Sequence, residues 1–239
     1  MGEVIHGDYS RWVNGQTLHS VTNYALHKAL YSGHNDHNYF EIAHTVKYLQ
    51  NMGDLDLYNF VDNHDVERIH TKLQNKAHFA PVHVLLYTLP GVPSIYYGSE
   101  FGIDGKKEKF SDASLRPALD LKDYADAVTK NPCKALIAAL GKVRQGTPAL
   151  SYGSYSELAL TNRHISSWKP DLTAVCSNTD TDPSVLYPYF FTCKSANIFI
   201  CASGWKIHLR LTVIIINGND HAYPIQIPGK SKRERKQCA

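Results

Sequence analysis

The segment LYNFVDNHDVERIH, residues 57–70, decides the fold prediction because it joins an apolar run to a dense group of polar side chains. Its first half is rich in residues that favour β-strands. Asp62, Asn63, His64 and Asp65 then follow one another directly. On spacing alone, this pattern favours a polar turn that caps the next helix, because Asn and Asp are common at such turns. The alternative is a strand that delivers side chains into a site.

Short β-rich runs alternate with helical patterns as far as about residue 150. Apolar residues three or four positions apart indicate helices near 39–51, 77–89 and 133–145. Asn38 and Asn131 are the expected N-caps of the first and last of these helices. The β-rich runs predict strands at 1–4, 20–24, 57–62 and 93–97. This alternation predicts an α/β fold with a parallel sheet.

Two carboxylates stand at the ends of predicted strands. Glu3 belongs to the first strand, and Asp65 follows the third. The carboxyl ends of parallel strands meet at one edge of a sheet, so we expect these side chains to converge. A pair of carboxylates can supply acid–base chemistry on acetals, and His64 can donate a hydrogen bond to a sugar hydroxyl.

The composition is that of an ordinary globular protein, with 43% hydrophobic and 20% charged residues among 239. The formal net charge is +3, but the last eleven residues hold five Lys or Arg and one Glu, which leaves −1 for the rest. A nearly neutral body argues against a nucleic-acid partner. Five Cys without a CxxC pair, and no metal-ligand spacing of Cys and His, predict reduced thiols and no resident metal or other cofactor.

Nothing in the sequence has the pattern of a targeting or membrane segment. The start, MGEVIHGDYS, lacks the basic and apolar regions of a signal peptide, so the expected location is cytoplasmic. The most apolar stretch, 185–202, is interrupted by Pro188 and Lys194. We therefore expect no membrane association.

After about residue 150 the pattern changes to β-strands without helices between them. YSELALTN and LTVIIINGNDHAYPIQIP (211–228) have this character. The sequence therefore predicts one unit over 1–153 and a small β domain over 154–228, in which 165–210 shows no clear periodicity. The basic tail, 229–239, is expected to be disordered.

Four motifs resemble those of the α-amylase family, glycoside hydrolase family 13, and they occur in that family's order. FVDNHD (60–65) resembles the seventh-strand motif, and GEVIHGD (2–8) resembles the fifth-strand motif. GVPSIYYGSEFG (91–102) is similar to the eighth-strand motif, and LRPALD (115–120) is similar to an arginine segment on the substrate side. The resemblance extends from residue 1 to about 163 and returns over 211–228.

This resemblance implies the C-terminal half of a (β/α)₈ TIM barrel followed by a small all-β C-terminal domain. It also implies action on α-glucans or malto-oligosaccharides, by hydrolysis or transfer at α-glucosidic bonds with retention of configuration. Glu3 takes the place of the general acid, and Asp65 that of a carboxylate that stabilises the distorted sugar.

The remaining site residues follow from the same resemblance. His64 is expected to bind hydroxyls of that sugar, while Asn63 more naturally supports the turn. Arg116 is expected on the substrate side. Tyr97 is as well explained by packing in the barrel wall as by contact with substrate.

The sequence also departs from the family, because it contains no Gly-x-Arg-x-Asp motif to supply the nucleophile. A retaining enzyme needs a nucleophile about 5 Å from its acid. We therefore expect that the first four βα units are missing, that Met1 is an internal start, and that the open barrel edges favour self-association. Calcium is known in the family, but this sequence gives no support for a calcium site.

Three hypotheses about function remain open at this point. The chain is a fragment of an α-glucan hydrolase that is inactive alone, a half-barrel that is active only when paired, or a non-catalytic module that binds α-glucans or other partners. Turnover of a chromogenic substrate separates the second from the others.

Overall fold

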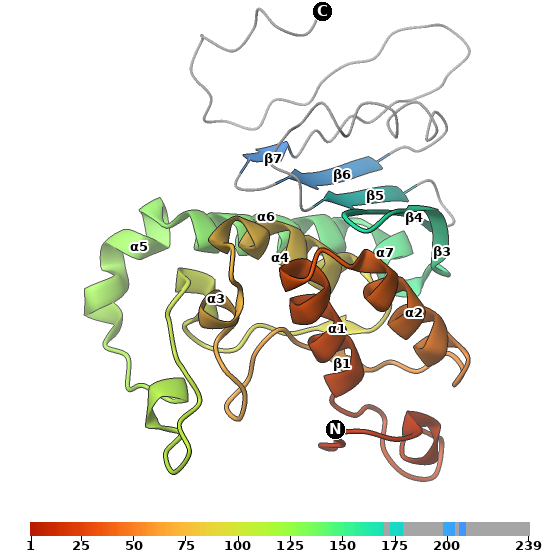
Figure 1. Ribbon diagram of the computed structural model, residues 1–239, viewed down its shortest axis with the longest axis horizontal. Coiled ribbons are helices and arrows are strands. Elements are labelled where there is room, and N and C mark those ends of the chain that lie inside the picture. The colour runs from red at the N-terminus through yellow and green to blue at the C-terminus, as the bar shows by residue number, and fades with distance from the viewer. Residues whose placement is uncertain (170–172, 179–197, 204–205, 209–239) are drawn as a thin grey trace, which may run out of the picture.

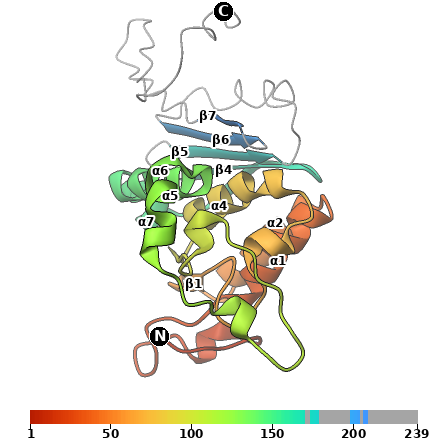
Figure 2. The same cartoon turned by 90° about the vertical axis from the view of Figure 1, so that its left-hand side faces the viewer.

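The helices lie between a group of short parallel strands and a five-stranded sheet (Figure 1). The perpendicular view shows the same order of layers (Figure 2). The computed structural model describes residues 1–169, 173–178, 198–203 and 206–208. The predicted strands over 211–228 and the basic tail lie outside the described residues.

The predicted parallel pairing is confirmed. Gly2 forms a parallel bridge with Val21, and Thr22 forms one with Tyr58. Strand β1 (Tyr58–Asn59) then pairs in parallel with β2 (Val92–Pro93). All four predicted strand segments therefore lie side by side, and their carboxyl ends share one edge.

The strands are shorter than the sequence predicted, since only Tyr58 and Asn59 of 57–62 form a strand. Two main-chain bonds join β1 to β2, from Val92 N to the oxygen of Leu57 and from Ser94 N to that of Asn59, each at 2.8 Å. Pro93 between them has no N–H to donate, which limits the ladder.

A glycine makes the turn into β2 feasible. Gly91 has a φ of 107°, a conformation that L side chains rarely adopt. A Cβ placed there would lie 2.7 Å from both Asn59 Nδ2 and the oxygen of Leu57. The side chain of Asn59 is fully buried, donates to the oxygen of Pro90 at 2.7 Å and accepts from Asn23 at 2.8 Å. This amide chain fixes the register of the parallel segments.

Seven α-helices are described: α1 (Tyr24–Asn35), α2 (Tyr39–Gln50), α3 (Ile69–Lys72), α4 (Phe79–Thr88), α5 (Ala125–Lys130), α6 (Pro132–Gly146) and α7 (Pro148–Tyr152). Short 3₁₀ helices occupy Tyr9–Arg11, Lys76–His78, Ser99–Phe101, Ala113–Leu115 and Leu121–Tyr124. The three predicted helices correspond to α2, α4 and α6, with ends that differ by at most two residues. Helix α1 is not among the three predicted helices; it begins at the end of the predicted strand 20–24.

The two predicted caps have different outcomes. The side chain of Asn131 accepts from the N–H groups of Cys133 and Lys134, so this cap is confirmed. Asn38 occupies the predicted N-cap position of α2, but its side chain makes no capping bond. Its place is taken by main chain, because Tyr39 N donates to the oxygen of Asn162 at 2.9 Å.

Helix α4 is the centre of the core, and almost all of its residues are buried. It packs against α1 and α6 and against β5 and β6. Its carboxyl end and the turn that follows it are held by Arg144, which donates to the oxygens of Tyr87 and Gly91, both at 2.6 Å. The two donors satisfy carbonyls that a helix end and a tight turn leave without partners.

The second sheet contains β3 (Ser156–Leu160), β4 (His164–Lys169), β5 (Thr173–Asn178), β6 (Ile198–Ser203) and β7 (Lys206–His208), in that order. Its pairs are antiparallel except β5 with β6, which is parallel. The strand predicted within 155–162 is confirmed, and four strands occupy the stretch that sequence periodicity left unassigned. The division into two domains stays a prediction.

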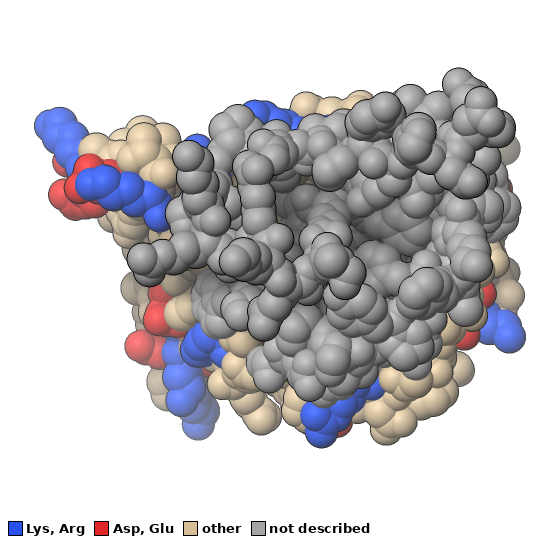
Figure 3. Space-filling view, turned by 90° about the horizontal axis from the view of Figure 1, so that it is seen from above, with Lys and Arg blue, Asp and Glu red and all other residues tan. Residues whose placement is uncertain are grey.

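The surface of the described part mixes charges of both signs. Seen from above, blue and red side chains alternate along the rim that the described residues form (Figure 3). Among the described residues, none of the helices is both long and apolar enough to cross a membrane.

Three buried histidines make the fold sensitive to acid. Burial lowers the pKa of His27 and of His83 to about 4, and that of His34 to about 3. In the unfolded chain each has its ordinary value near 6.5. Their neutral forms therefore stabilise the folded state above pH 6.5, and this contribution is lost as the pH falls toward 4.

We expect the urea midpoint of unfolding to decline between pH 6.5 and 4. His83→Leu should make this decline shallower, because one buried group no longer has to stay neutral. His44→Gln, at an exposed position of α2, is the control and should follow the wild type. Equal pH dependence of His83→Leu and the wild type would contradict this account.

Candidate active site

Glu3, His64 and Asp65 meet at the carboxyl ends of the first and third parallel segments. Their oxygen and nitrogen atoms that could bind a ligand all lie within 4.8 Å of one another. Glu3 and His64 are exposed, and Asp65 is partly exposed. The expected convergence of these three side chains is confirmed.

The turn after β1 is built by the side chain of Asn63. Its Oδ1 accepts from the N–H of Asp65 at 2.8 Å and from that of Val66 at 3.1 Å. This turn fixes the direction in which Asp65 leaves the backbone. The expected supporting role of Asn63 is confirmed.

The side chain of Asp62 forms its hydrogen bonds inside the protein. Its side chain is buried and accepts from Ile69 N at 2.7 Å and from Ser99 Oγ at 2.8 Å. Burial raises the pKa of its carboxyl group. Asp62 thus satisfies the first N–H of α3, while Asp65 faces the surface. The polar stretch therefore contains both a cap for the next helix, made by Asp62, and side chains that converge at the surface; the role of the latter as a site stays a prediction.

Arg116 holds Asp65 in place. Its Nη2 lies 2.8 Å from Asp65 Oδ1 and 3.3 Å from Asp112 Oδ2. Its Nε donates to the main-chain oxygen of His64 at 3.1 Å, and His64 Nε2 lies 3.4 Å from Asp65 Oδ2. Arg116 and Asp65 are both nearly half exposed, so the pair adds little stability and mainly orients the carboxylate.

Tyr97 contacts the segment that carries Arg116. Its hydroxyl donates to the main-chain oxygen of Pro117 at 2.8 Å, and its ring centroid lies 5.1 Å from the Arg68 guanidinium carbon. The hydroxyl is therefore engaged with protein rather than directed at the three converging side chains. This geometry favours the packing interpretation, although 42% of Tyr97 is exposed.

Tyr24 is a site residue that the sequence reasoning missed. Its hydroxyl donates to Glu3 Oε1 at 2.7 Å and accepts from Asn63 Nδ2 at 3.1 Å. Tyr24 is the last residue of the second predicted strand, 20–24, so the rule that selected Glu3 and Asp65, a polar residue at a strand end, could have found it.

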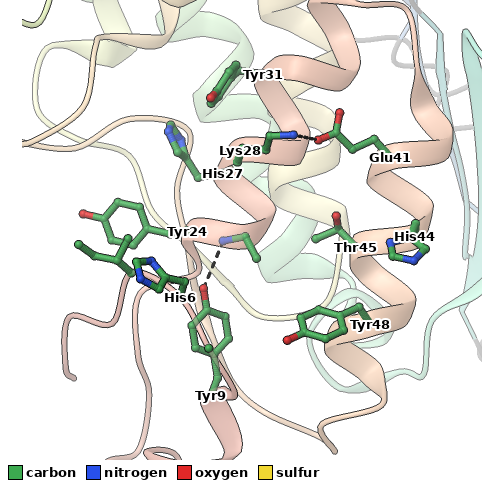
Figure 4. A pocket seen from close by; sticks show the side chains of 13 residues that line it. His6, Tyr9, Tyr24, His27, Lys28, Tyr31, Glu41, His44, Thr45 and Tyr48 are labelled. Carbon is green, nitrogen blue, oxygen red and sulfur yellow. Dashed lines mark hydrogen bonds and ion pairs between the residues drawn. The ribbon is translucent and has the colours of Figure 1, made fainter.

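A hollow of about 620 Å³ opens beside Tyr24 (Figure 4). The loop after the first strand, α1 and α2 surround it, and Lys28 and Glu41 form an ion pair across its wall. Its aromatic and imidazole side chains are His6, Tyr9, Tyr24, His27, Tyr31, His44 and Tyr48. Tyr9 anchors the loop, since its hydroxyl accepts from Ala25 N at 3.2 Å.

Arg68 supports the loops of the site from the interior of the protein. It is fully buried and donates to the oxygens of Tyr97 and Leu115 at 2.6 and 2.7 Å and to Ser99 Oγ at 3.1 Å. Its guanidinium carbon lies 4.2 Å from the centre of the Tyr96 ring. One cation thus joins the segments that carry Asp65, Tyr97 and Arg116.

Among the described residues, Glu3, His64 and Asp65 form the one group whose spacing could hold a metal ion. Calcium prefers six to eight oxygen ligands. This group offers two carboxylates and an imidazole, and Arg116 already neutralises Asp65. These residues do not fit a calcium ion.

Comparison with known proteins gives the family. Residues 1–157 match the model of the α-amylase catalytic domain. The chain belongs to the α-amylase family. The family's catalytic domain is a TIM barrel, and the four parallel segments with their helices are part of that fold.

Curated relatives include a cyclomaltodextrin glucanotransferase of Bacillus sp. (strain 1011), 33% identical over 107 residues, which are 45% of this chain and 14% of that protein. An intracellular maltogenic amylase of Bacillus subtilis is 28% identical over 115 residues, 45% of this chain and 19% of that protein. This α-amylase family chain therefore matches less than a fifth of the length of either relative.

Solved structures give the same fold. A cyclomaltodextrinase superposes with a TM-score of 0.65 at 24% identity, covering 75% of this chain and 32% of the other. An α-amylase from Malbranchea cinnamomea gives 0.61 at 22% identity, covering 72% and 37%. At this level of identity the likeness concerns the fold alone.

Arg68→Lys should lower the free energy of unfolding by about 2–5 kcal/mol, because an ammonium group cannot reach three separate acceptors and stack on Tyr96. Urea unfolding at pH 7 measures this. Arg116→Lys is the matched control and should change stability by about 1 kcal/mol or less, since its ion pair lies in solvent. Equal losses in both variants would show that Arg68 does not hold the loops.

Proposed function

We propose that this α-amylase family chain binds an α-glucan across the strand ends and carries two of the groups needed to cleave or transfer an α-glucosidic bond. The observation that supports this most is the convergence of Glu3, His64 and Asp65 within 4.8 Å. The relatives are named for cyclomaltodextrins and maltose, so malto-oligosaccharides are the proposed substrate class.

Each residue has a proposed role that its surroundings support. Glu3 protonates the leaving oxygen and later activates water or an acceptor hydroxyl. Asp65, oriented by Arg116, stabilises the positive charge that develops on the sugar ring. His64, whose ring is about half exposed, donates to hydroxyls of the same sugar. Tyr97 is a flanking residue at the edge of this surface.

No sequence motif of this chain supplies the nucleophile. The 239 residues contain no Gly-x-Arg-x-Asp sequence. Asp65 lies close enough to Glu3 to form a carboxylate pair, but Arg116 holds one of its oxygens and the family resemblance assigns it to the sugar hydroxyls. We therefore assign residues 1–153 to the second half of the barrel, with the acid and the stabilising carboxylate.

We expect no p-nitrophenol release above buffer when the purified 239-residue chain is incubated with p-nitrophenyl α-maltoside. Losing one member of a cooperating catalytic set commonly costs about 10⁴- to 10⁶-fold in rate. Glu3→Gln and Asp65→Asn are measured in parallel. Turnover by the wild type that disappears in both variants would show that Asp65, or another group, replaces the nucleophile.

Binding of maltoheptaose, measured by isothermal titration calorimetry, should be weakened about tenfold to a hundredfold by Asp65→Asn. Hydrogen bonds to a charged group contribute about 1.5–3 kcal/mol, and the amide cannot replace them fully. Asp54→Asn is the matched control, because Asp54 is exposed in the connection before β1, at the opposite end of the strands. No binding by the wild type, or equal losses in both variants, would refute the proposed site.

A further inference from the structure

Tyr24 lies between two residues of the site that come from different strand ends. Its hydroxyl is 2.7 Å from Glu3 Oε1 and 3.1 Å from Asn63 Nδ2. We propose that Tyr24 is a positioning residue that determines which oxygen of Glu3 carries the transferable proton. This inference rests on the proposed function for its chemical meaning, but the hydrogen-bond arrangement can be tested without it.

The direction of this hydrogen-bond chain is fixed by the backbone. Asn63 Oδ1 accepts from two main-chain N–H groups, those of Asp65 and Val66. The amide group of Asn63 therefore directs its N–H at Tyr24, because the reversed orientation would lose both bonds. The phenol oxygen accepts that N–H, and its single proton is left for Glu3 Oε1.

The packing of Tyr24 keeps its hydroxyl in this place. Its ring meets Phe60 edge to face, with centroids 4.9 Å apart. Tyr24 is also the first residue of α1, whose N-cap Asn23 accepts from Leu26 N at 3.1 Å. A phenol on a capped helix end, packed against a buried ring, has little freedom to turn away.

Burial raises the pKa of Tyr24 to about 12, and the charges of Glu3 and Asp65 raise it while Asn63 lowers it. Tyr24 therefore stays a hydrogen-bond donor at any pH at which a glycosidase works. Because Oε1 accepts this bond, the acidic proton of Glu3 resides on Oε2.

The proton transfer is then specific to one oxygen. The Oε2–H bond breaks as the glycosidic oxygen takes the proton, the electron pair of the anomeric carbon–oxygen bond leaves with that oxygen, and the anomeric carbon bonds to the nucleophile of the complete site, for which this chain has no motif. Oε2, now ionised, later accepts a proton from the water or acceptor hydroxyl whose oxygen displaces that nucleophile. Oε1 remains bonded to Tyr24 throughout, so the side chain keeps its orientation during both steps.

The arrangement is tested by the ionisation of Tyr24, followed by NMR of tyrosine labelled with ¹³C at Cζ and assigned with Tyr24→Phe. At pH 11 about a tenth of the Tyr24 side chains should be ionised in the wild type. Glu3→Gln should raise this fraction, because an anion no longer opposes the phenolate. Asn63→Asp should lower it, because the turn keeps its acceptor while Tyr24 loses a donor. Changes of equal sign, or no change, would overturn the proposal.

A second measurement at pH 7 uses maltotetraose and an analogue in which an amine replaces one glycosidic oxygen. The protonated amine pairs with Oε2 of an oriented Glu3, so the analogue should bind more tightly to the wild type. Tyr24→Phe keeps the ring and should reduce this preference several-fold. Equal weakening of both ligands would indicate a structural role only and overturn the proposal.

Tyr31→Phe is the control, because Tyr31 lies two turns farther along α1 and also borders the hollow, whereas the hydrogen bond to Glu3 comes from Tyr24. The preference of the Tyr31→Phe variant for the amine analogue should equal that of the wild type. If neither saccharide binds the wild type, the proposed function fails, while the Tyr24 titration still decides whether the hydrogen-bond chain exists.

Discussion

One buried guanidinium group holds the loops on which the candidate site depends. Arg68 has no contact with solvent, and its donors reach main-chain oxygens of two other loops. A fully buried charge is costly unless its hydrogen bonds are made, so each loop has to arrive in the right place for Arg68 to be tolerated. Gly105 allows this, because a Cβ there would lie 2.7 Å from Arg68 Cγ. The surface carboxylates are thus positioned from inside the molecule.

The polar turn after β1 carries one buried carboxylate and one that is exposed to solvent. Asp62 and Asp65 are three residues apart, yet one is buried with two donors and the other lies in solvent beside a cation. The buried carboxylate ties α3 to the loop after β2, and the exposed one remains available for a ligand. A single turn built by Asn63 separates these environments, which explains why four polar residues follow one another in the sequence.

Much of this arrangement could be predicted from local patterns. Alternating strands and helices placed Glu3 and Asp65 at one edge, and apolar spacing located α2, α4 and α6. One feature was out of reach, because a distant partner decides it: main-chain atoms of residue 162 replace the expected cap of α2. Tyr24 could have been selected by its place at a strand end, but its hydrogen bond to Glu3 is visible only in the structure. The sequence of 165–210 shows neither the helical nor the strand periodicity of apolar residues, so its strands could not be recognised.

The bond from Tyr39 N to the oxygen of Asn162 has a consequence for the order in which the molecule forms during synthesis. It joins residues 123 positions apart, so α2 can bury its first turn only after the β3–β4 connection has left the ribosome. The α1–α2 hairpin is local and can form much earlier. Until the later hairpin docks, the apolar face of α2 that β3 and β4 cover stays exposed, a state that chaperones recognise. The second sheet therefore completes the folding of a helix that was synthesised long before it.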